Sequence, residues 1–572
     1  VFCLFLFIRR QPVSTLFPYP TLFRSSVSDP QASSGGASEH RVLRSVSVVS
    51  FMTAISRALG LVREIAMAYF FGTSALKSAF DIAFIIPNLF RRLFGEGALS
   101  SAFVPVFGEA LVKEGRESAY RFAVKVISFL VLVLGVVTVA GILLTYPLAQ
   151  VLPEGSRWLI PLPMLRVMLP YALLICVAAL VSGMLNTLGR FAVSSLTPFL
   201  LNLIWILTLV VCPFLRETPE KQIMVLSWAI LFAGLAQVLF QLPELARHGF
   251  RLRLCFTGLL ADAKLRRVLT LMGPAALGIG LIQINVCVDK FLAFWADAAA
   301  PAALEYAERI VYLPLGMFGT AFMTVLLPTF SRQAASGDRG VMRETLERAI
   351  RHLAVIMAPC SAALAVLAFP VIMLIYNFKG GQFDAGSGVL SARALAAYAP
   401  GLLVFSFQKA VTPAFYGLQD LRTPVRVSLF GLVLNITLNV ASVVLLPHGW
   451  KHVGIAGSTV ATSLVNGVTL AVILHRRIGA PRAGRILLPV GKAVGCALAM
   501  ALCVCAFHAA GGLALEGAGL GGKIPQVGLM GATVAVGMAV YGALMVCVSR
   551  RELSEMVGEF RGRRRKGGRD GE

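Results

Sequence analysis

Charged side chains interrupt one strongly apolar stretch of the chain, residues 56–105. The charged residues there include Arg57, Arg63, Glu64, Asp81, Arg91, Arg92 and Glu96. A charge at the centre of a bilayer costs about 2.5–3.5 kcal/mol on insertion scales, so exposing all of them to lipid would seriously oppose insertion. They are tolerated where they face water or one another inside a helix bundle. The pattern indicates a polar, mostly cationic cavity at membrane depth that takes an anionic ligand. Charges that snorkel near helix ends, or that merely join helices, are the structural alternative.

The spacing of these charges assigns them to faces of two helices. Arg57 and Glu64 are seven residues apart and share one helical stripe, while Arg63 lies on the adjacent face. Arg92 and Glu96 are four residues apart, which is the spacing of an intrahelical ion pair. These positions are therefore candidates for ligand binding and for an ion-pair network.

Further polar residues lie in apolar stretches later in the chain. The charged members are Asp289, Glu308 and Arg309, and the neutral members are Asn435, Asn439 and Thr462. Asn435 and Asn439 are four residues apart and share a helix face. Polar contacts between helices are the commoner use of such residues. A cation site that includes Asp289 is the sharper hypothesis.

The composition requires that these residues be positioned by membrane-spanning helices. The chain has 572 residues, of which 57% are hydrophobic and 14% are charged, with a mean hydropathy of +0.79. Soluble domains carry about 25% charged residues, so a soluble globule is excluded. The apolar runs are too long for barrel strands, and lipid offers no partners for backbone groups, so helices are expected. We predict an all-α polytopic membrane protein with about fourteen spans: 46–70, 78–105, 124–150, 162–188, 193–214, 223–245, 268–296, 305–330, 350–376, 390–417, 425–446, 453–475, 486–508 and 526–548.

The net charge of +24 is distributed over alternate loops between these spans. Basic loops mark the cytoplasmic side, so both termini are predicted to be cytoplasmic, as an even number of spans requires. The basic tail is expected to contact anionic membrane lipids rather than nucleic acid, with solvated charge as the alternative. The ten cysteines show no metal-binding spacing and are interpreted as small core residues.

A weak internal repeat suggests two halves. The run LLPTFSRQAASGDR echoes FVPVFGEALVKEGR about 223 residues earlier, although chance similarity between apolar sequences is a competing explanation. Two six-helix halves suit a transporter with its site at the interface between them. The predicted division is as follows: 1–40 a non-native or disordered lead, 41–246 an N-terminal lobe, 247–267 a cytoplasmic linker, 268–477 a C-terminal lobe, 478–549 a final helix pair with a groove for a lipid tail, and 550–572 a basic cytoplasmic tail.

Motifs of soluble-type enzymes are absent from the sequence. There is no Walker loop, no HExxH, no GxSxG in a strand–turn–helix context and no DxD pair. We therefore expect a transporter rather than an enzyme, with no cofactor. Without a nucleotide site, uphill transport would draw on an ion gradient or the membrane potential.

Four runs of the sequence carry a specific resemblance. They are SRALGLVREIAMAYFFG, DIAFIIPNLFRRLFGEGALSSAFVPVF, YAERIVYLPLGMFGTAFMTVLLPTFS and PAFYGLQDLRTPV. Over roughly residues 42–550 the chain closely resembles the bacterial lipid II flippase family (MurJ, also called MviN) of the MOP exporter superfamily. The resemblance implies two six-helix lobes plus a helix pair in the bacterial inner membrane. It also implies movement of the lipid-linked peptidoglycan precursor lipid II to the periplasmic leaflet by alternating access, in the service of cell-wall synthesis and cell shape. A monomer is expected.

The resemblance also assigns roles to individual residues. Arg57 and Arg63 match essential arginines of the first span, Arg309 matches the arginine of an ADR motif, written AER here, and Arg91 matches the one in PNLFRR. We expect Arg57, Arg63 and Arg309 to bind the diphosphate or the head group of the lipid, because arginine forks suit a diphosphate. We expect Arg91 with Glu96 to support the inward gate. Some family members have an aspartate in the second span at the position of Ser78. The nearest aspartate in this chain is Asp81, one helical turn further on. A sodium site of some members implies Asp289, Asn435, Asn439 and Thr462 as ligands, although Asn439 replaces an acid.

Three other functional classes compete with this interpretation. A related flippase of undecaprenyl-linked polysaccharide or a multidrug exporter is the first, but an exporter of cationic drugs should prefer acidic cavities. A membrane-bound glycan enzyme would need an acid or base at a membrane face, and the outer loops are short without paired carboxylates. A scaffold would not require intramembrane charge.

Overall fold

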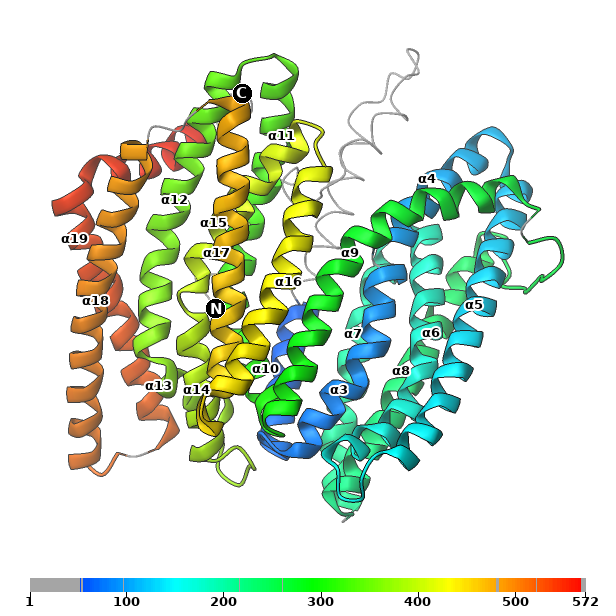
Figure 1. Cartoon of the computed structure of the whole chain (residues 1–572), viewed down its shortest axis with the longest axis horizontal. Helices are drawn as coiled ribbons and strands as arrows, with labels where there is room; N and C mark the ends of the chain where they lie inside the picture. The colour runs from blue at the N-terminus through cyan, green and yellow to red at the C-terminus, as the bar shows by residue number, and fades with distance from the viewer. Residues whose placement is uncertain are drawn as a thin grey trace. The chain divides into compact units, whose positions relative to one another are not determined.

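The computed structural model describes residues 52, 55–95, 97–215, 217–259, 261–479, 483–520 and 522–566. Throughout these residues the regular secondary structure is helical (Figure 1). The predicted lead, residues 1–40, lies outside the described residues. The first long helix covers residues 55–71.

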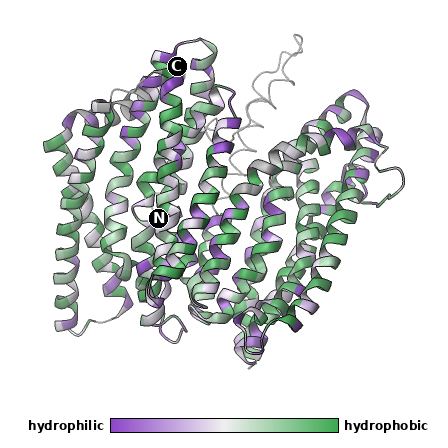
Figure 2. Ribbon diagram, in the orientation of Figure 1, coloured by the Kyte–Doolittle hydropathy of each residue, from purple (hydrophilic) through white to green (hydrophobic). Residues whose placement is uncertain are grey.

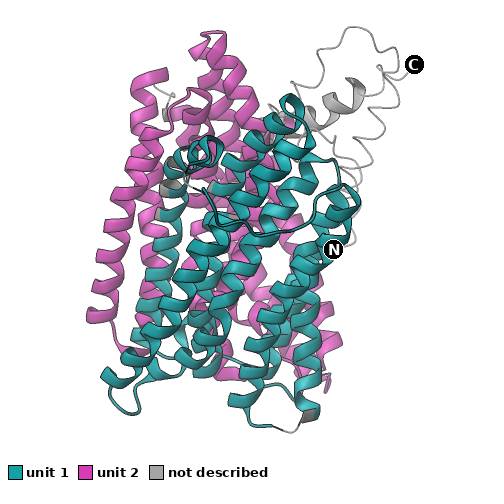
Figure 3. Cartoon of the chain, turned by 90° about the vertical axis from the view of Figure 1, so that its right-hand side faces the viewer, with its two compact units in different colours: residues 1–302, 380–382 teal, residues 303–379, 383–572 magenta. Residues whose placement is uncertain are grey.

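The chain divides into two compact units, shown in two colours in Figure 3. Unit 1 comprises residues 1–302 and 380–382, and unit 2 comprises residues 303–379 and 383–572. After the helix over residues 55–71, the helices of unit 1 are α3 (Ala75–Phe90), η3 (Arg91–Gly95), α4 (Ala98–Lys113), α5 (Arg116–Val151), η4 (Arg157–Leu159), α6 (Pro161–Thr187), α7 (Phe191–Val211), η5 (Cys212–Leu215), α8 (Pro219–Arg247) and α9 (Ala263–Ala296).

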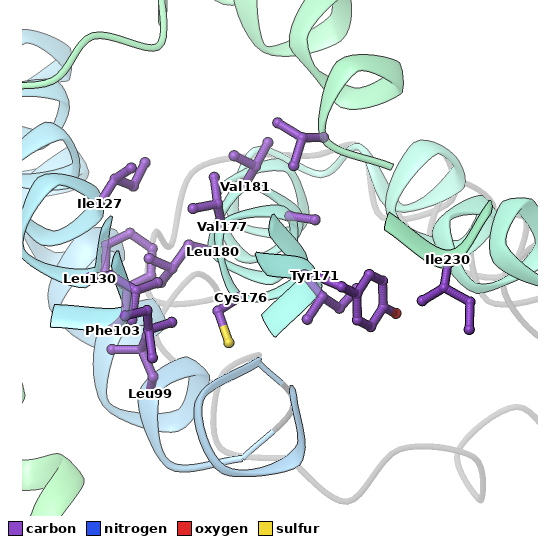
Figure 4. Close-up of a cluster of buried hydrophobic side chains, with 14 of the residues drawn as sticks. Leu99, Phe103, Ile127, Leu130, Tyr171, Cys176, Val177, Leu180, Val181 and Ile230 are labelled. Atoms are coloured by element: carbon purple, nitrogen blue, oxygen red, sulfur yellow. The ribbon is translucent and has the colours of Figure 1, made fainter. Parts of the chain in front are cut away.

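Helix α6 lies at the centre of unit 1. It packs against α3, α4, α5 and α8, and its Tyr171 and Cys176 are fully buried. Figure 4 shows these two side chains among apolar neighbours that include Phe103 of α4 and Leu130 of α5. Between membrane-spanning helices such contacts stabilise the fold through van der Waals packing, because lipid tails are as apolar as the side chains themselves. The result is a continuous apolar core that supports the polar residues on α3 and α7.

Unit 2 is organised around α12 and α15. The helices that follow α9 are α10 (Ala300–Pro314), η6 (Leu315–Gly319), α11 (Thr320–Ala335), α12 (Arg339–Val366), α13 (Ala368–Tyr376), α14 (Ala385–Tyr398), α15 (Gly401–Gly417), α16 (Arg422–Leu445), η7 (His448–Trp450), α17 (Lys451–Ile478), α18 (Ala483–Gly517) and α19 (Lys523–Lys566). Helix α12 packs against α15 and α18, and α15 packs against α11 and α17. Helix α19 is broken at Ser549, where the backbone is non-helical, and continues into the basic tail.

Ten helices of the described part are long and apolar enough to cross a membrane, or eleven when the bent pair α14 and α15 counts as one span. Hydrophobic residues predominate along them (Figure 2). The predicted spans 46–70, 78–105 and 268–296 are also helical in their described parts but lie outside this count. The all-α membrane architecture is thus confirmed, while fourteen remains the predicted number of spans.

The observed units do not coincide with the predicted lobes. Helix α9 packs against α3 and α4 within unit 1, although the sequence analysis assigned it to the C-terminal lobe. Hydropathy locates a helix but carries no information about its packing partners, so a lobe boundary is not readable from it. The division into lobes at residues 246 and 268 remains a prediction.

The weak sequence repeat has a counterpart in the backbone. In the first copy, α3 is followed by the π-helical turn η3 and then by α4. In the second, α10 is followed by the π-helical turn η6 and then by α11. Pro105 lies inside α4 and Pro328 inside α11. Because each π-turn lies directly before the helix that contains the repeated proline, the two turns mark equivalent places in the two copies. A π-turn inserts one residue into a helix and is frequent at functional sites.

Candidate functional site

Arg63 is the best-positioned of the predicted ligand-binding residues. Its Nη1 donates a hydrogen bond to Asn202 Oδ1 of α7 at 3.0 Å, and its Nη2 lies 2.6 Å from Glu64 Oε1. Asn202 Nδ2 in turn donates to the carbonyl of Ser56 at 3.1 Å. Among the described residues, Arg63 Nε is buried without a hydrogen-bond partner. Two of the five N–H groups of the guanidinium are thus engaged by Asn202 and Glu64, which fixes its orientation.

Aromatic packing holds this guanidinium from the other side. The Cζ of Arg63 lies 4.4 Å from the centroid of the Trp205 ring, a cation–π arrangement. Trp205 is itself packed edge-on against Phe80 and Phe84 of α3, with ring centroids 5.3 Å and 5.5 Å away. Because Trp205 is buried, the arginine is set against a rigid surface. The sequence analysis did not identify Trp205, which in the sequence is one aromatic residue inside an apolar run.

The other predicted cations of unit 1 are less constrained. Arg57 is exposed on the helix over residues 55–71, and no hydrogen bond or ion pair to it is found within the described ranges. Arg91 is half-buried in η3, and its Nε donates to Asn88 Oδ1 at 2.9 Å. Arg92 is exposed and donates to Gln283 of α9 at 3.2 Å. Glu96 lies outside the described residues, so its pairing with Arg92 stays a prediction.

Asp81 forms an ion pair with a residue that the sequence analysis missed. Lys77 Nζ lies 2.5 Å and 2.6 Å from the two carboxylate oxygens of Asp81, one turn along α3, and both side chains are buried. Between them Ser78 is fully buried, and its Oγ accepts a hydrogen bond from the amide of Ala302 at 3.3 Å. A lysine four residues before an aspartate is a signal that could have been read from the sequence.

The remaining predicted charges lie on α9 and α10. Asp289 is half-buried on α9, where Asn285 Nδ2 approaches its carboxylate at 3.4 Å. Glu308 and Arg309 are half-buried on α10. Asp289 belongs to unit 1 and Arg309 to unit 2. Each residue is therefore placed within its own unit.

The neutral candidates of unit 2 form a buried polar group between α16 and α17. Asn435 and Asn439 are fully buried, and Asn439 Nδ2 donates to Asn435 Oδ1 at 2.8 Å. Among the described residues, Thr462 Oγ1 and Asn466 Oδ1 are buried without a hydrogen-bond partner. Buried oxygens without donors are costly, and hard oxygen ligands of this kind suit Na⁺. Asn466 is a further candidate that the sequence analysis did not single out.

Ion pairs join helix ends and the linker outside the spans of unit 1. Arg267 Nη1 lies 2.9 Å from Glu109, which also pairs with Lys113 at 2.9 Å, and Lys264 pairs with Glu114. Hydrogen bonds from Lys113 and Arg267 hold the pKa of Glu109 below its usual range, and those from Lys264 and Ser118 lower the pKa of Glu114. These contacts tie the beginning of α9 to the ends of α4 and α5.

Comparison with known proteins gives one family. The family described as lipid II flippase MurJ matches residues 67–511. A probable lipid II flippase MurJ of Vibrio cholerae is 34% identical over 446 residues, which cover 76% of this chain and 82% of that protein. The lipid II flippase MurJ of Burkholderia cenocepacia is 31% identical over 443 residues, which cover 76% of this chain and 84% of that protein.

Solved structures agree on the fold. A lipid II flippase MurJ in an inward closed conformation matches with a TM-score of 0.69 at 21% identity, covering 88% of this chain and 98% of that one. An inward-facing multidrug resistance MATE transporter of the MOP superfamily matches with a TM-score of 0.61 at 15% identity, covering 76% of this chain and 98% of that one. The chain therefore belongs to the lipid II flippase MurJ family, whose members are multi-pass proteins of the bacterial inner membrane.

Proposed function

We propose that this chain is a flippase that moves lipid II from the cytoplasmic to the periplasmic leaflet for peptidoglycan synthesis. The observation that carries the proposal is the family match over residues 67–511, together with relatives that are 31–34% identical over about three quarters of the chain. The mechanism is alternating access, and the chain acts as a transporter rather than as an enzyme.

Arg63 supplies the clearest physical support for an anionic substrate. Its Nη1 and Nη2 are engaged by Asn202 and Glu64, whereas its buried Nε has no hydrogen-bond partner among the described residues. A guanidinium offers five donors in a planar fork that matches phosphate oxygens. We propose that Arg63 and the exposed Arg57 bind the diphosphate in unit 1, and that Arg309 binds the same class of group in unit 2. Arg91, Arg92 and Glu96 would support the gate.

The multidrug exporter is the second candidate function, because a MATE transporter shares the fold at a TM-score of 0.61. That likeness, at 15% identity, concerns the fold alone. The charges at the proposed sites favour the flippase, because arginines attract a diphosphate and would repel a cationic drug.

Sodium is proposed as the coupling ion, with the membrane potential as the alternative driving force. Unit 2 contributes neutral oxygens from Asn435, Asn439 and Thr462, and Thr462 Oγ1 is buried without a hydrogen-bond partner among the described residues. These hard oxygen donors fit Na⁺ in chemistry. Asp289, the fourth predicted ligand, belongs to unit 1, so its share in a sodium site stays a prediction.

Topology and partners complete the proposal. Both termini lie in the cytoplasm, and the basic residues that follow the break at Ser549 contact anionic lipid headgroups. A groove along α18 and α19 would accommodate the lipid tail. The protein acts as a monomer and binds no nucleic acid.

The test is rescue of a bacterial strain whose own lipid II flippase is depleted. The wild-type chain should restore growth, and Arg57→Ala, Arg63→Ala and Arg309→Ala should each fail at matched expression. Arg166→Ala is the matched control. Within the described chain, Arg166 of α6 contacts only Thr145 and the ring of Tyr146 on α5, so this variant should still support growth. Growth supported equally by Arg57→Ala and Arg309→Ala would show that the assignment of these arginines is wrong.

A further inference from the structure

A lysine of unit 2 lies against the second π-helical turn. In the first copy of the repeat, the turn η3 itself contains two cations, Arg91 and Arg92. In the second copy the turn η6 reads LGMFG and has no charge. There the neighbouring helix α15 packs against η6 and brings Lys409 to it.

Two glycines allow α15 to approach this closely. A methyl group on Gly319 would lie 2.9 Å from Lys409 Cδ and 3.0 Å from Leu315, too close for either to stay in place. Gly319 has an ordinary helical φ of −62°, so it is needed for space rather than for conformation. At the C-terminal end of α15, a methyl group on Gly417 would lie 2.9 Å from the backbone carbon of Phe330. The stem of Lys409 is thus packed into a gap that the turn provides.

The charge of Lys409 is uncompensated. It is half-buried, and over the described residues no hydrogen bond or ion pair to its ammonium is found. Lys77 of unit 1 provides the contrast, because it is fully buried and bonded to both oxygens of Asp81. An unpaired charge at membrane depth is expensive and is by default a functional one. Lys409 lies eight residues before Gly417, the last residue of α15, which is about 12 Å along the helix axis.

We propose that Lys409 binds phosphate of the transported lipid, as a binding residue additional to the arginines. An ammonium carries three donors and acts on phosphate as a point charge, where arginine acts as a planar fork. The inference rests on the proposed flippase function and adds a cation of unit 2, placed against the turn that corresponds to the one holding Arg91. The ligand chemistry is a diphosphate, which could be a lipid headgroup or the free ion.

Binding of a fluorescent undecaprenyl diphosphate to the purified full-length protein in nanodiscs of neutral lipid tests this proposal. Lys409→Met removes the charge and keeps the length of the side chain. It should weaken binding of the undecaprenyl diphosphate about ten-fold, because one charge-assisted hydrogen bond is lost. Lys492→Met is the matched control, because Lys492 donates a hydrogen bond to the carbonyl of Val548. This variant loses no charge-assisted bond to the ligand, so its affinity should stay within about two-fold of wild type. Inorganic diphosphate should compete poorly if the lipid is the source of the phosphate, and effective competition would reassign the site to the free ion and overturn the lipid proposal.

The failures of this proposal and of the flippase function are distinguishable. If the wild-type chain does not bind undecaprenyl diphosphate, the flippase function fails and this inference falls with it. If wild type and Lys409→Met bind equally, only this inference is overturned, and Lys409 merely snorkels. The midpoint temperature of thermal unfolding is the second measurement. Removal of an uncompensated charge should leave this temperature unchanged or raise it. A lower midpoint for Lys409→Met would identify a structural lysine and overturn the proposal.

Discussion

The two copies of the repeat use the same backbone but distribute charge differently. In α3 of unit 1 Lys77 and Asp81 form a buried ion pair, and in η3 Arg91 donates a hydrogen bond to the neutral amide of Asn88. At η6 of unit 2 the turn is apolar, and the cation comes from α15 without a partner in the described chain. Removing one partner of a buried ion pair destabilises the fold, whereas removing an unpaired charge should not. The comparison therefore separates structural from ligand-binding cations, and mutations can test that separation.

The largest effect is expected at Arg63, which has both roles. Arg63→Ala breaks the ion pair with the buried carboxylate of Glu64, and breaking a buried pair destabilises by about 3–5 kcal/mol. The thermal midpoint in detergent should fall markedly, and growth rescue should be lost. Adding Glu64→Gln should recover most of the midpoint but not growth. Recovery of both would assign Arg63 a purely structural role.

Lys77 and Lys409 provide the direct contrast between a paired and an unpaired lysine. Lys77→Met breaks the buried ion pair with Asp81 and should destabilise by about 3 kcal/mol. Because an apolar pair can replace a buried ion pair at little cost, the double variant Lys77→Met with Asp81→Leu should melt near wild type. Lys409→Met should not lower the midpoint at all. Equal destabilisation by Lys77→Met and Lys409→Met would remove the distinction between the two copies.

The glycine contacts of α15 should differ in cost. Gly417→Ala forces the new methyl group against the backbone of Phe330 and Ser331, and overpacking of this kind costs about 1–3 kcal/mol. Gly319→Ala meets mainly the side chains of Lys409 and Leu315, which can shift, so its cost should be smaller. Gly316→Ala, with open space around it, is the control. The thermal midpoint should fall most for Gly417→Ala, less for Gly319→Ala and least for Gly316→Ala. The reverse order would contradict the packing of α15 described above.

Thr462 tests whether the buried oxygens of unit 2 hold a cation. Thr462→Val removes a hydroxyl that has no partner among the described residues, so in potassium buffer the free energy of unfolding should change by less than about 1 kcal/mol. If sodium binds there, wild type should be stabilised by sodium over potassium and Thr462→Val should lose that difference. Sodium stabilisation that persists in Thr462→Val would place the ion elsewhere.

The smallest effect concerns the exposed ion pairs at the ends of α4, α5 and α9. The lowered pKa values of Glu109 and Glu114 give a stabilisation that is present above the ordinary glutamate pKa of about 4.3. It is lost as the pH falls through the lowered folded-state values. The midpoint should therefore be flat near neutral pH and decline below about pH 4.5. Glu109→Gln with Glu114→Gln should flatten the decline slightly, and an unchanged profile would show that these pairs contribute nothing measurable.

Sequence patterns predicted the helices well, because lipid leaves a spanning chain no other way to satisfy its backbone. They also pointed to the repeat, through the echo around Pro105 and Pro328. The pair of Lys77 and Asp81 was readable from its spacing and was missed. The contact of Arg63 with Asn202, 139 residues away, carries no local signal at all. The π-turns and the approach of α15 to Gly319 depend on tertiary packing, which periodicity does not encode.

Lipid II exposure in the outer leaflet tests the central claim most directly. In cells depleted of their own flippase, an enzyme or label added outside should reach lipid II only when a working flippase is present. The wild-type chain should restore this access within the time of depletion, and the Arg63→Ala chain with Glu64→Gln, stable but lacking the arginine, should not. Lipid II that stays inaccessible in cells containing folded, membrane-inserted wild-type chain would contradict the proposed function.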